Sequence, residues 1–194
     1  LLGTINSSTG KLVVNSEDSI KTSESIDGKD ITFNAKNNII LGNAEKATTI
    51  TSNNLTLNTK EGNINQLANN NIVSNIIKAN ANTGINLRSE TNKFNSINLG
   101  NNSENILLNN SGASGLGVTF DRTENAGNIT INNSTGNLVI NSSATATGEK
   151  DITFNNGIGD IIVAENANLT AGKDITVTAT GNINTNNSTL IATN

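Results

Sequence analysis

The chain has 194 residues and a formal net charge of −4, and it contains no Pro, Cys, His, Met, Trp or Tyr. Basic residues form no run and aromatic residues make up only 2% of the chain, so a nucleic-acid partner is not expected. Without His and Cys, the sequence lacks the usual general base, the thiolate nucleophile and most transition-metal ligands, so no cofactor is expected. The absence of Met, including at position 1, predicts a segment of a longer chain.

Asparagine is the dominant residue, with 41 copies, while Ile, Leu, Val and Phe together number 50. An asparagine-rich tract can be disordered or prone to aggregation. Here, however, aliphatic residues interrupt the asparagines at regular intervals, and their number lies above the level at which chains fail to fold. The composition therefore predicts a folded chain in which nearly every backbone group is paired.

One phrase occurs twice, at 4–16 and at 130–142, with ten of its thirteen positions identical. Each copy predicts a short strand, a polar turn closed by glycine, and a second short strand. In the second copy the turn is expected at 132–136. Because side chains alternate along a strand, the predicted core residues of this copy are Ile131, Leu138 and Ile140.

Short strands are expected throughout the first part of the chain. Residues 17–28 are charged and rich in serine, which predicts a loop. The apolar spacing of 66–81 suits either a bent pair of strands or one helical turn, and strands are the preferred prediction. Residues 111–127 break the pattern. The predicted strands before that break are 29–34, 38–42, 49–51, 54–58, 62–65, 84–87, 96–100 and 105–109.

The phrases of the first part recur in the same order after residue 130. The chain therefore divides into a first repeat array at 1–66, irregular middle coils at 67–127 and a second repeat array at 128–194. Matching phrases of the two arrays are 29–34 with 150–155, 38–41 with 160–163, and 62–65 with 181–184.

The second array has a constant period, because Ile129, Ile152 and Ile175 follow one another at equal intervals. Short strands that return at a constant interval describe a parallel β-helix, in which inward aliphatic side chains stack one coil above the next. The sequence therefore predicts an all-β, right-handed parallel β-helix (solenoid) of about 8–9 coils of roughly 20–25 residues. A single such segment is expected to span residues 1–194.

The phrases at 28–34 and 127–143, the stacked Asn-, Thr- and Gly-rich repeats and the missing Cys resemble the repeat-rich shaft of large secreted adhesins. These adhesins are exported by two-partner secretion, and the chain is most similar to the high-molecular-weight, filamentous-haemagglutinin-like adhesins of Gram-negative bacteria. The resemblance covers most of the chain and is weakest over 66–127. Asn-Pro motifs mark the secretion domain of this family, and their absence implies a passenger segment.

This resemblance implies a right-handed β-helical fibre that is secreted and tethered to the bacterial outer membrane. It implies attachment to host epithelial cells through sialylated or other surface glycans. The second implied partner is the outer-membrane transporter, which acts on parts of the precursor outside this chain. Two alternatives remain open: a purely structural stalk that presents a distal binding domain, and a polysaccharide-active β-helical enzyme. Such an enzyme needs clustered carboxylates, whereas the acids here are spaced singly, so we expect no catalysis.

A glycan site needs rigidly held hydrogen-bonding groups, and a sialic acid carboxylate favours an arginine fork. Arg88 and Arg122 are the only arginines of the chain. Arg122 follows Phe120 in the irregular segment before the second array, where its guanidinium, the aromatic edge and Asn125 could converge. These four residues are the candidate site, and the alternative is a solvated arginine beside a core phenylalanine. The loop at 17–27 is a second candidate region.

Members of this adhesin family are similar in carrying hexoses on asparagine within Asn-x-Ser/Thr. The number of these motifs in the chain matches what chance predicts for so much Asn, Ser and Thr, so only the resemblance points to modification. The candidate acceptors are Asn6, Asn54, Asn101, Asn109, Asn128, Asn132, Asn133, Asn141, Asn168, Asn186 and Asn187.

Overall fold

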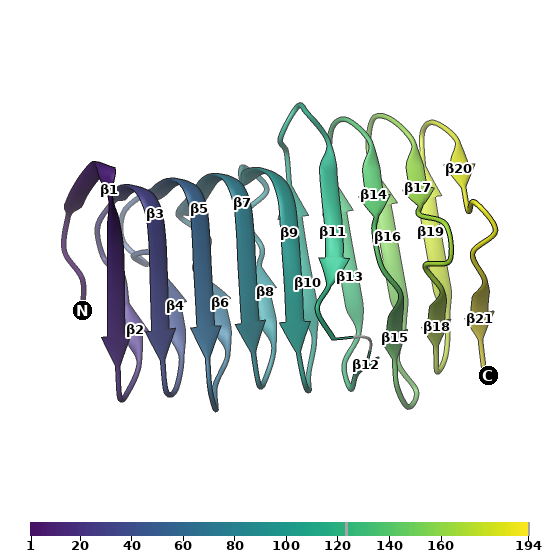
Figure 1. Ribbon diagram of the computed structural model, residues 1–194, viewed down its shortest axis with the longest axis horizontal. Helices are drawn as coiled ribbons and strands as arrows, with labels where there is room; N and C mark the ends of the chain where they lie inside the picture. Colours follow the sequence, from purple (N-terminus) through teal and green to yellow (C-terminus); the bar gives the residue numbers. More distant parts are fainter. Residues whose placement is uncertain (123, 194) are drawn as a thin grey trace.

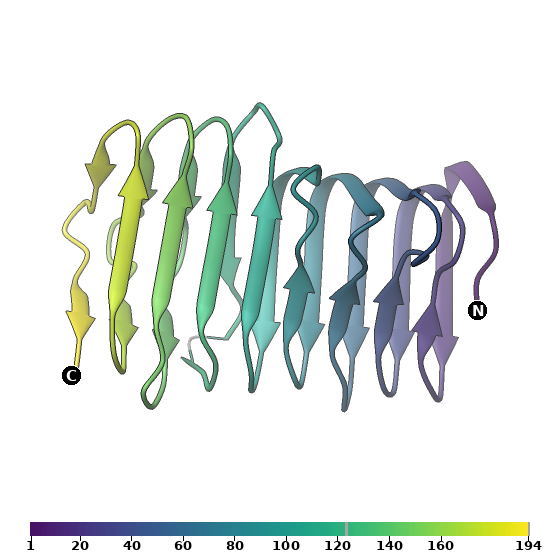
Figure 2. The ribbon, with the colours of Figure 1, turned by 180° about the vertical axis from the view of Figure 1, so that it is seen from behind.

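A computed structural model describes residues 1–122 and 124–193 and consists of parallel strands stacked into a solenoid of about eight turns (Figure 1). The chain runs down one face and up the opposite face while it advances toward the C-terminus, which is a right-handed winding (Figures 1 and 2). The predicted fold class is thus confirmed. Within the described ranges no helix is long and apolar enough to cross a bilayer.

A nine-stranded parallel sheet forms the face nearest the viewer in Figure 1. Each strand pairs with its counterpart one coil later, so backbone hydrogen bonds run along the solenoid axis. In stacking order the strands are β1 (Ile5–Ser16), β3 (Ile26–Ala35), β5 (Thr48–Thr59), β7 (Asn70–Ala81), β9 (Lys93–Asn101), β11 (Leu116–Phe120), β14 (Leu138–Ile140), β17 (Ile161–Val163) and β20 (Ile183–Asn184).

An eight-stranded parallel sheet forms the opposite face, which Figure 2 shows in front. Its first strands are very short, and its later strands are longer. In stacking order the strands are β2 (Ile20–Lys21), β4 (Ile39–Leu41), β6 (Ile64–Gln66), β8 (Ile85–Leu87), β10 (Ile106–Asn110), β13 (Ile129–Asn133), β16 (Ile152–Asn156) and β19 (Ile175–Ala179).

A third, four-stranded sheet begins only after β11 and adds another side to the later coils. The long strands of the early coils, such as β5 and β7, give way there to much shorter strands such as β14 and β16. The four strands are β12 (Glu124–Asn125), β15 (Ala144–Ala146), β18 (Leu169–Ala171) and β21 (Leu190–Ala192).

The length of a coil varies, because turns of different length separate the strands. Ile20 pairs with Ile39, and Ile39 in turn pairs with Ile64 after a distinctly longer stretch of chain. The later coils are regular, since Ile129, Ile152 and Ile175 pair in succession at the predicted interval. The coil from Ile20 to Ile39 is slightly shorter than the predicted range of roughly 20–25 residues. The lengths of the other coils lie within that range.

The core is one column of inward aliphatic and aromatic side chains. In the second copy of the repeated phrase, Ile131, Leu138 and Ile140 are fully buried, as predicted, and Val139 faces outward. Burial of such a side chain contributes roughly 2 kcal/mol. The same alternation recurs along the solenoid as far as β18, beyond which the strands of the last coil are more exposed.

The first copy of the phrase folds differently from its prediction. Instead of a strand, a turn and a second strand, residues 5–16 form the single strand β1, whose register shifts between Ser7 and Lys11. It pairs along its length with β3, which is also one long strand. Three residues of β1 lie opposite Lys29 alone, and the excess is taken up as a bulge. The second copy has the predicted turn, but β13 continues through Asn133, so the turn lies at 134–137 rather than 132–136.

The prediction of a loop at residues 17–28 is also wrong in part. This segment contains β2 and the beginning of β3, and Ile20, Thr22 and Ile26 are almost completely buried. The strands are too short for their alternation to stand out among the surrounding charged and serine residues. Of residues 67–127, predicted to form irregular coils, 67–110 extend both sheets without a break. The preferred prediction of strand rather than helix for 66–81 is confirmed, but the segment forms one strand, β7, instead of a bent pair.

Matching phrases of the two arrays occupy different sheets. The phrase at 29–34 lies in β3 of the nine-stranded sheet, whereas its copy at 150–155 supplies most of β16 in the eight-stranded sheet. Likewise β4 belongs to the eight-stranded sheet and its sequence counterpart β17 to the nine-stranded sheet. The intervening segment 111–127 supplies β11 and β12, so the second array starts on the opposite sheet from the first.

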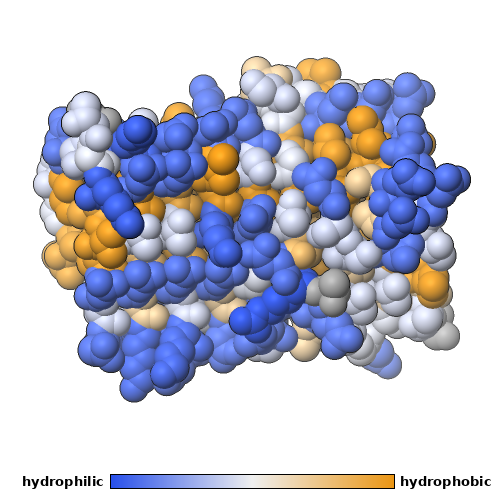
Figure 3. Space-filling view, in the orientation of Figure 1, coloured by the Kyte–Doolittle hydropathy of each residue, from blue (hydrophilic) through white to orange (hydrophobic). Residues whose placement is uncertain are grey.

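An outward ladder of asparagine side chains links four early coils along the nine-stranded sheet. In each step the Nδ2 of one asparagine donates to the Oδ1 of the asparagine one coil earlier, over 2.8 to 3.0 Å. The ladder ends where Gly100 takes the next position in register. These asparagines lie near the lower ends of the early strands in Figure 1, where Figure 3 shows a band of hydrophilic residues across the early coils. The ladder consists of Asn15, Asn34, Asn58 and Asn80.

An inward asparagine ladder links three coils at a corner of the eight-stranded sheet. The Nδ2 of Asn110 donates to the Oδ1 of Asn133 over 3.0 Å, and that of Asn133 donates to the Oδ1 of Asn156 over 2.9 Å. Asn133 also donates to the backbone oxygens of Thr135 and Gly136, which hold the following turn. None of the three asparagines is more than 2% exposed. Buried amides require such partners, because an unpaired one costs about 1–3 kcal/mol.

Candidate glycan-binding site

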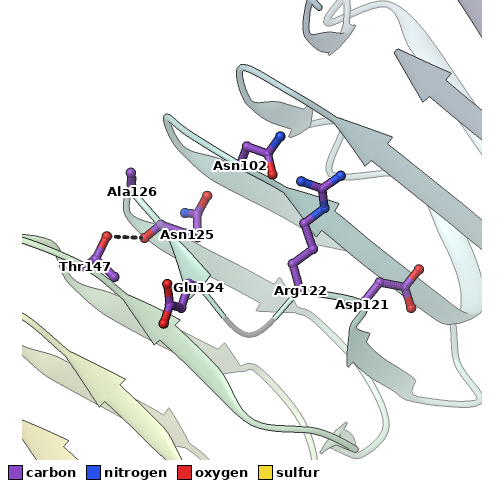
Figure 4. A pocket seen from close by; sticks show the side chains of 7 residues that line it. All are labelled: Asn102, Asp121, Arg122, Glu124, Asn125, Ala126 and Thr147. Atoms are coloured by element: carbon purple, nitrogen blue, oxygen red, sulfur yellow. Dashed lines mark hydrogen bonds between the residues drawn. The ribbon is translucent and has the colours of Figure 1, made fainter. Parts of the chain in front are cut away.

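An open hollow of about 620 Å³ lies beside Arg122, where the four-stranded sheet begins. Figure 4 shows the Arg122 side chain extending toward Asn102, while Glu124 and Thr147 lie on the far side of the hollow. The residues that line it are Asn102, Asp121, Arg122, Glu124, Asn125, Ala126 and Thr147.

The hollow results from the change in cross-section. Strand β12 is the first strand of its sheet and has no partner strand in the preceding coil of the described chain. On the N-terminal side, the backbone of Asp121 is held by Leu99, whose oxygen accepts from the Asp121 N–H over 2.8 Å. The Asp121 carboxylate lies 3.5 Å from the Lys78 Nζ. The backbone at Asp121 is therefore held by pairing with the preceding coil, whereas the Arg122 side chain is exposed to solvent.

Asn125 forms part of the wall of this hollow, but its amide is already engaged. Its Oδ1 accepts from the Asn101 Nδ2 over 2.6 Å, and its Nδ2 donates to the Gly127 oxygen over 2.8 Å. Its backbone oxygen accepts from the Thr147 N–H over 2.8 Å. The residue is 4% exposed, so Asn125 shapes the hollow rather than offering a free amide to a ligand.

Two other predicted site residues are not available at this hollow. Phe120 is 5% exposed and belongs to the core, so it has no free aromatic edge for a sugar. Arg88 is exposed but follows β8 and does not line the hollow; its backbone oxygen accepts from the Asn109 Nδ2 over 2.7 Å. Of the four predicted residues, the structure thus brings together Arg122 and Asn125 only.

The charges around Arg122 argue against an acidic ligand at this point. Asp121 and Glu124 line the same hollow, so two carboxylates accompany one guanidinium. An approaching carboxylate would meet like charge, and the predicted arginine fork for sialic acid is therefore poorly placed. Amide, hydroxyl and carboxylate groups are instead suited to the hydroxyls of a neutral sugar.

A second hollow, of about 510 Å³, lies at the turns that follow β1, β3 and β5, and no sequence pattern predicted it. Only Glu17, at the start of the candidate loop 17–27, falls within it. Lys36 and Lys60 each lie two positions after an asparagine of the outward ladder. Because the coils that carry them differ in length, no constant sequence period indicated that they lie close together. The lining residues are Asn15, Ser16, Glu17, Asn34, Ala35, Lys36 and Lys60.

The structure divides the candidate glycosylation sites by accessibility. Asn101 and Asn133 are 2% and 1% exposed, so neither amide can accept a sugar in the folded protein. Asn54, Asn109, Asn128 and Asn132 are half-buried, and the amide nitrogens of all but Asn128 are engaged in hydrogen bonds. The exposed candidates are Asn6, Asn141, Asn168, Asn186 and Asn187.

Acidic side chains do not gather in the part of the chain that the structure describes: no group of three or more Asp or Glu residues is arranged to hold a metal ion. Comparisons with protein-family models, curated proteins and solved structures found no match. The chemistry of the two hollows and the resemblance of the repeated phrases are therefore the starting points for a function.

Proposed function

We propose that this chain is a segment of a secreted bacterial surface adhesin that attaches to glycans of host epithelial cells. In this proposal the parent protein leaves the cell through an outer-membrane transporter and stays tethered to the outer membrane. The supporting observation is a polar hollow bordered by paired backbone at the place where the solenoid changes its cross-section. The resemblance of the repeated phrases to adhesin shafts supports the same function.

Rigidity is the first support. Backbone pairing holds the residues on both sides of the hollow, because Asp121 bonds to Leu99 and β12 pairs with β15. A ligand that binds a preformed surface loses less free energy to ordering of the protein. Weak polar contacts with a sugar are most effective on such a scaffold.

The composition of the hollow is the second support. Asn102, Thr147 and Arg122 supply amide, hydroxyl and guanidinium groups, and Asp121 and Glu124 supply acceptors. Sugar hydroxyls both donate and accept hydrogen bonds, so a surface that combines both kinds of group is complementary to them. The hollow is open, as a site for the end or side of a surface glycan must be.

A purely structural stalk is the second candidate, and the asparagine ladders favour it. They stabilise a rod, and the rod could serve only to hold a distal domain away from the cell. A glycan array probed with the folded segment separates the two functions. An adhesin segment gives reproducible binding to a defined set of glycans, whereas a stalk gives none above background while circular dichroism shows intact β-structure.

A further inference from the structure

Two lysines stack on one another at the second hollow. The Lys36 N–H donates to the Ser16 oxygen over 3.0 Å, and the Lys60 N–H donates to the Ala35 oxygen over 3.1 Å. These bonds continue the register of β1, β3 and β5, so Glu17, Lys36 and Lys60 follow one another in adjacent coils. Adjacent strands are about 4.8 Å apart, which brings the two lysine side chains close together.

Neither lysine forms an ion pair with another described residue, although Glu17 lies one coil before Lys36. Both side chains are exposed, and the ion pairs found among the described residues involve other lysines, namely Lys46, Lys78 and Lys173. Like charges directly opposite one another on neighbouring strands repel. An anionic group between Lys36 and Lys60 would relieve this repulsion and would accept charge-assisted hydrogen bonds from both.

The outward asparagine ladder directs a donor into the same hollow. Because every Nδ2 in this ladder donates toward the N-terminal coil, Asn34 donates to Asn15 over 2.8 Å. Asn15 is the N-terminal member of the ladder and lines the hollow. Its Nδ2 donates to no acceptor in the described part of the chain. An anion held by the two lysines would therefore also meet an amide donor.

Charge distinguishes this hollow from four other surface hollows of about 200 to 620 Å³. Each of those four contains at least as many carboxylates as cationic groups, whereas this one contains two lysines and only one carboxylate, that of Glu17. In a chain with a net charge of −4, it is a local positive region that would attract anions.

We propose that the hollow formed by Asn15, Lys36 and Lys60 binds an anionic group of a surface glycan, a carboxylate or a sulfate. This site rests on the proposed attachment to glycans and adds a subsite distinct from the hollow beside Arg122. The two lysines hold the anion and the Asn15 amide orients it, while the hollow keeps a net positive charge because Glu17 is the only carboxylate among its lining residues.

Calorimetric titration of the folded segment tests this site with sialyllactose, neutral lactose and a sulfated heparin hexasaccharide. The informative variant is K36Q/K60Q, which removes both charges and keeps a polar, unbranched side chain at each position. The matched control is K150Q/K173Q, since Lys150 and Lys173 are also one coil apart, joined by a 3.1 Å backbone hydrogen bond, but have Asp174 beside them. Thermal melting verifies that all forms are folded.

We expect an acidic probe to bind wild type at least tenfold more tightly than lactose. K36Q/K60Q should weaken this binding at least tenfold and K150Q/K173Q less than twofold, and added salt should weaken it through screening. The response to sialyllactose or to heparin identifies a carboxylate or a sulfate as the ligand. Equal binding of acidic probes to wild type and K36Q/K60Q would overturn the site but leave glycan attachment intact. Absence of binding by every glycan would overturn both.

Discussion

Phe33 and Phe154 end the same Lys-Asp-Ile-Thr-Phe phrase, yet they enter the core from different sheets. Phe33 lies in β3 of the nine-stranded sheet, Phe154 lies in β16 of the eight-stranded sheet, and both are fully buried. The phrase thus specifies a strand with one apolar side, and the surrounding coils determine the side of the solenoid on which it packs.

Because both phenylalanines are fully buried, their removal should be equally harmful despite their different sheets. Phe33→Ala and Phe154→Ala should each lower the free energy of unfolding by about 3–5 kcal/mol. Ile158→Ala is the control, since Ile158 is 65% exposed, and it should change stability by less than about 0.5 kcal/mol. Chemical denaturation measures all three. A loss below about 1 kcal/mol for either phenylalanine would show that its assigned burial is wrong.

Two neighbouring asparagines should respond very differently to truncation. Asn133 is inward and joins the buried ladder, whereas Asn132 belongs to an outward ladder with Asn109 and Asn155. Asn133→Ala leaves buried polar groups unpaired and should cost about 2–4 kcal/mol, while Asn132→Ala should cost about 0.5–1 kcal/mol. Equal losses in thermal or urea unfolding would contradict the assigned register of β13.

Much of the architecture was predictable because strand periodicity depends on local sequence. The spacing of Ile129, Ile152 and Ile175 indicated the coil, and alternation identified Leu138 and Ile140 as core residues. The change of sheet between the arrays was not predictable, because an apolar strand fits either face of a solenoid. The change of sheet accompanies the start of the four-stranded sheet at β12. Strand β12 is too short to leave a signal in the sequence.

The sequence pointed to the segment that contains Arg122, because repetition breaks there. The structure places an open hollow beside Arg122, and glycan binding in that hollow stays a prediction. Burial of Phe120 could not be distinguished from exposure without the register of β11. Lys36 and Lys60 are brought together by coils of unequal length, and no single period in the sequence relates them to Asn15.

Arg122 should contribute to glycan attachment while Arg88 should not. Arg122→Ala removes the only cationic group among the described residues that line its hollow. It should weaken neutral-glycan binding roughly ten- to hundredfold, as expected for a charge-assisted hydrogen bond worth about 1.5–3 kcal/mol. Arg88→Ala removes the same charge elsewhere and should have little effect. Titration with glycans selected on the array measures both, and unchanged affinity in Arg122→Ala would exclude this hollow as the binding site.

Glycosylation, if it follows the proposed adhesin function, should be restricted by burial. Intact-mass and peptide analysis of native material should find hexose increments and assign them to exposed acceptors. No hexose is expected on Asn101 or Asn133, because their amides are enclosed by neighbouring coils. Hexose on Asn133 in folded protein would contradict the inward ladder. A native mass without any hexose increment would show that the chain is not glycosylated. The expected acceptors are Asn6, Asn141, Asn168, Asn186 and Asn187.

The most direct test of adhesin function is attachment of the folded segment to cultured epithelial cells, measured before and after enzymatic removal of their surface glycans. We expect saturable attachment that falls at least tenfold after the glycans are removed. Attachment that is absent, or that persists unchanged on deglycosylated cells, would contradict glycan-dependent adhesion by this solenoid.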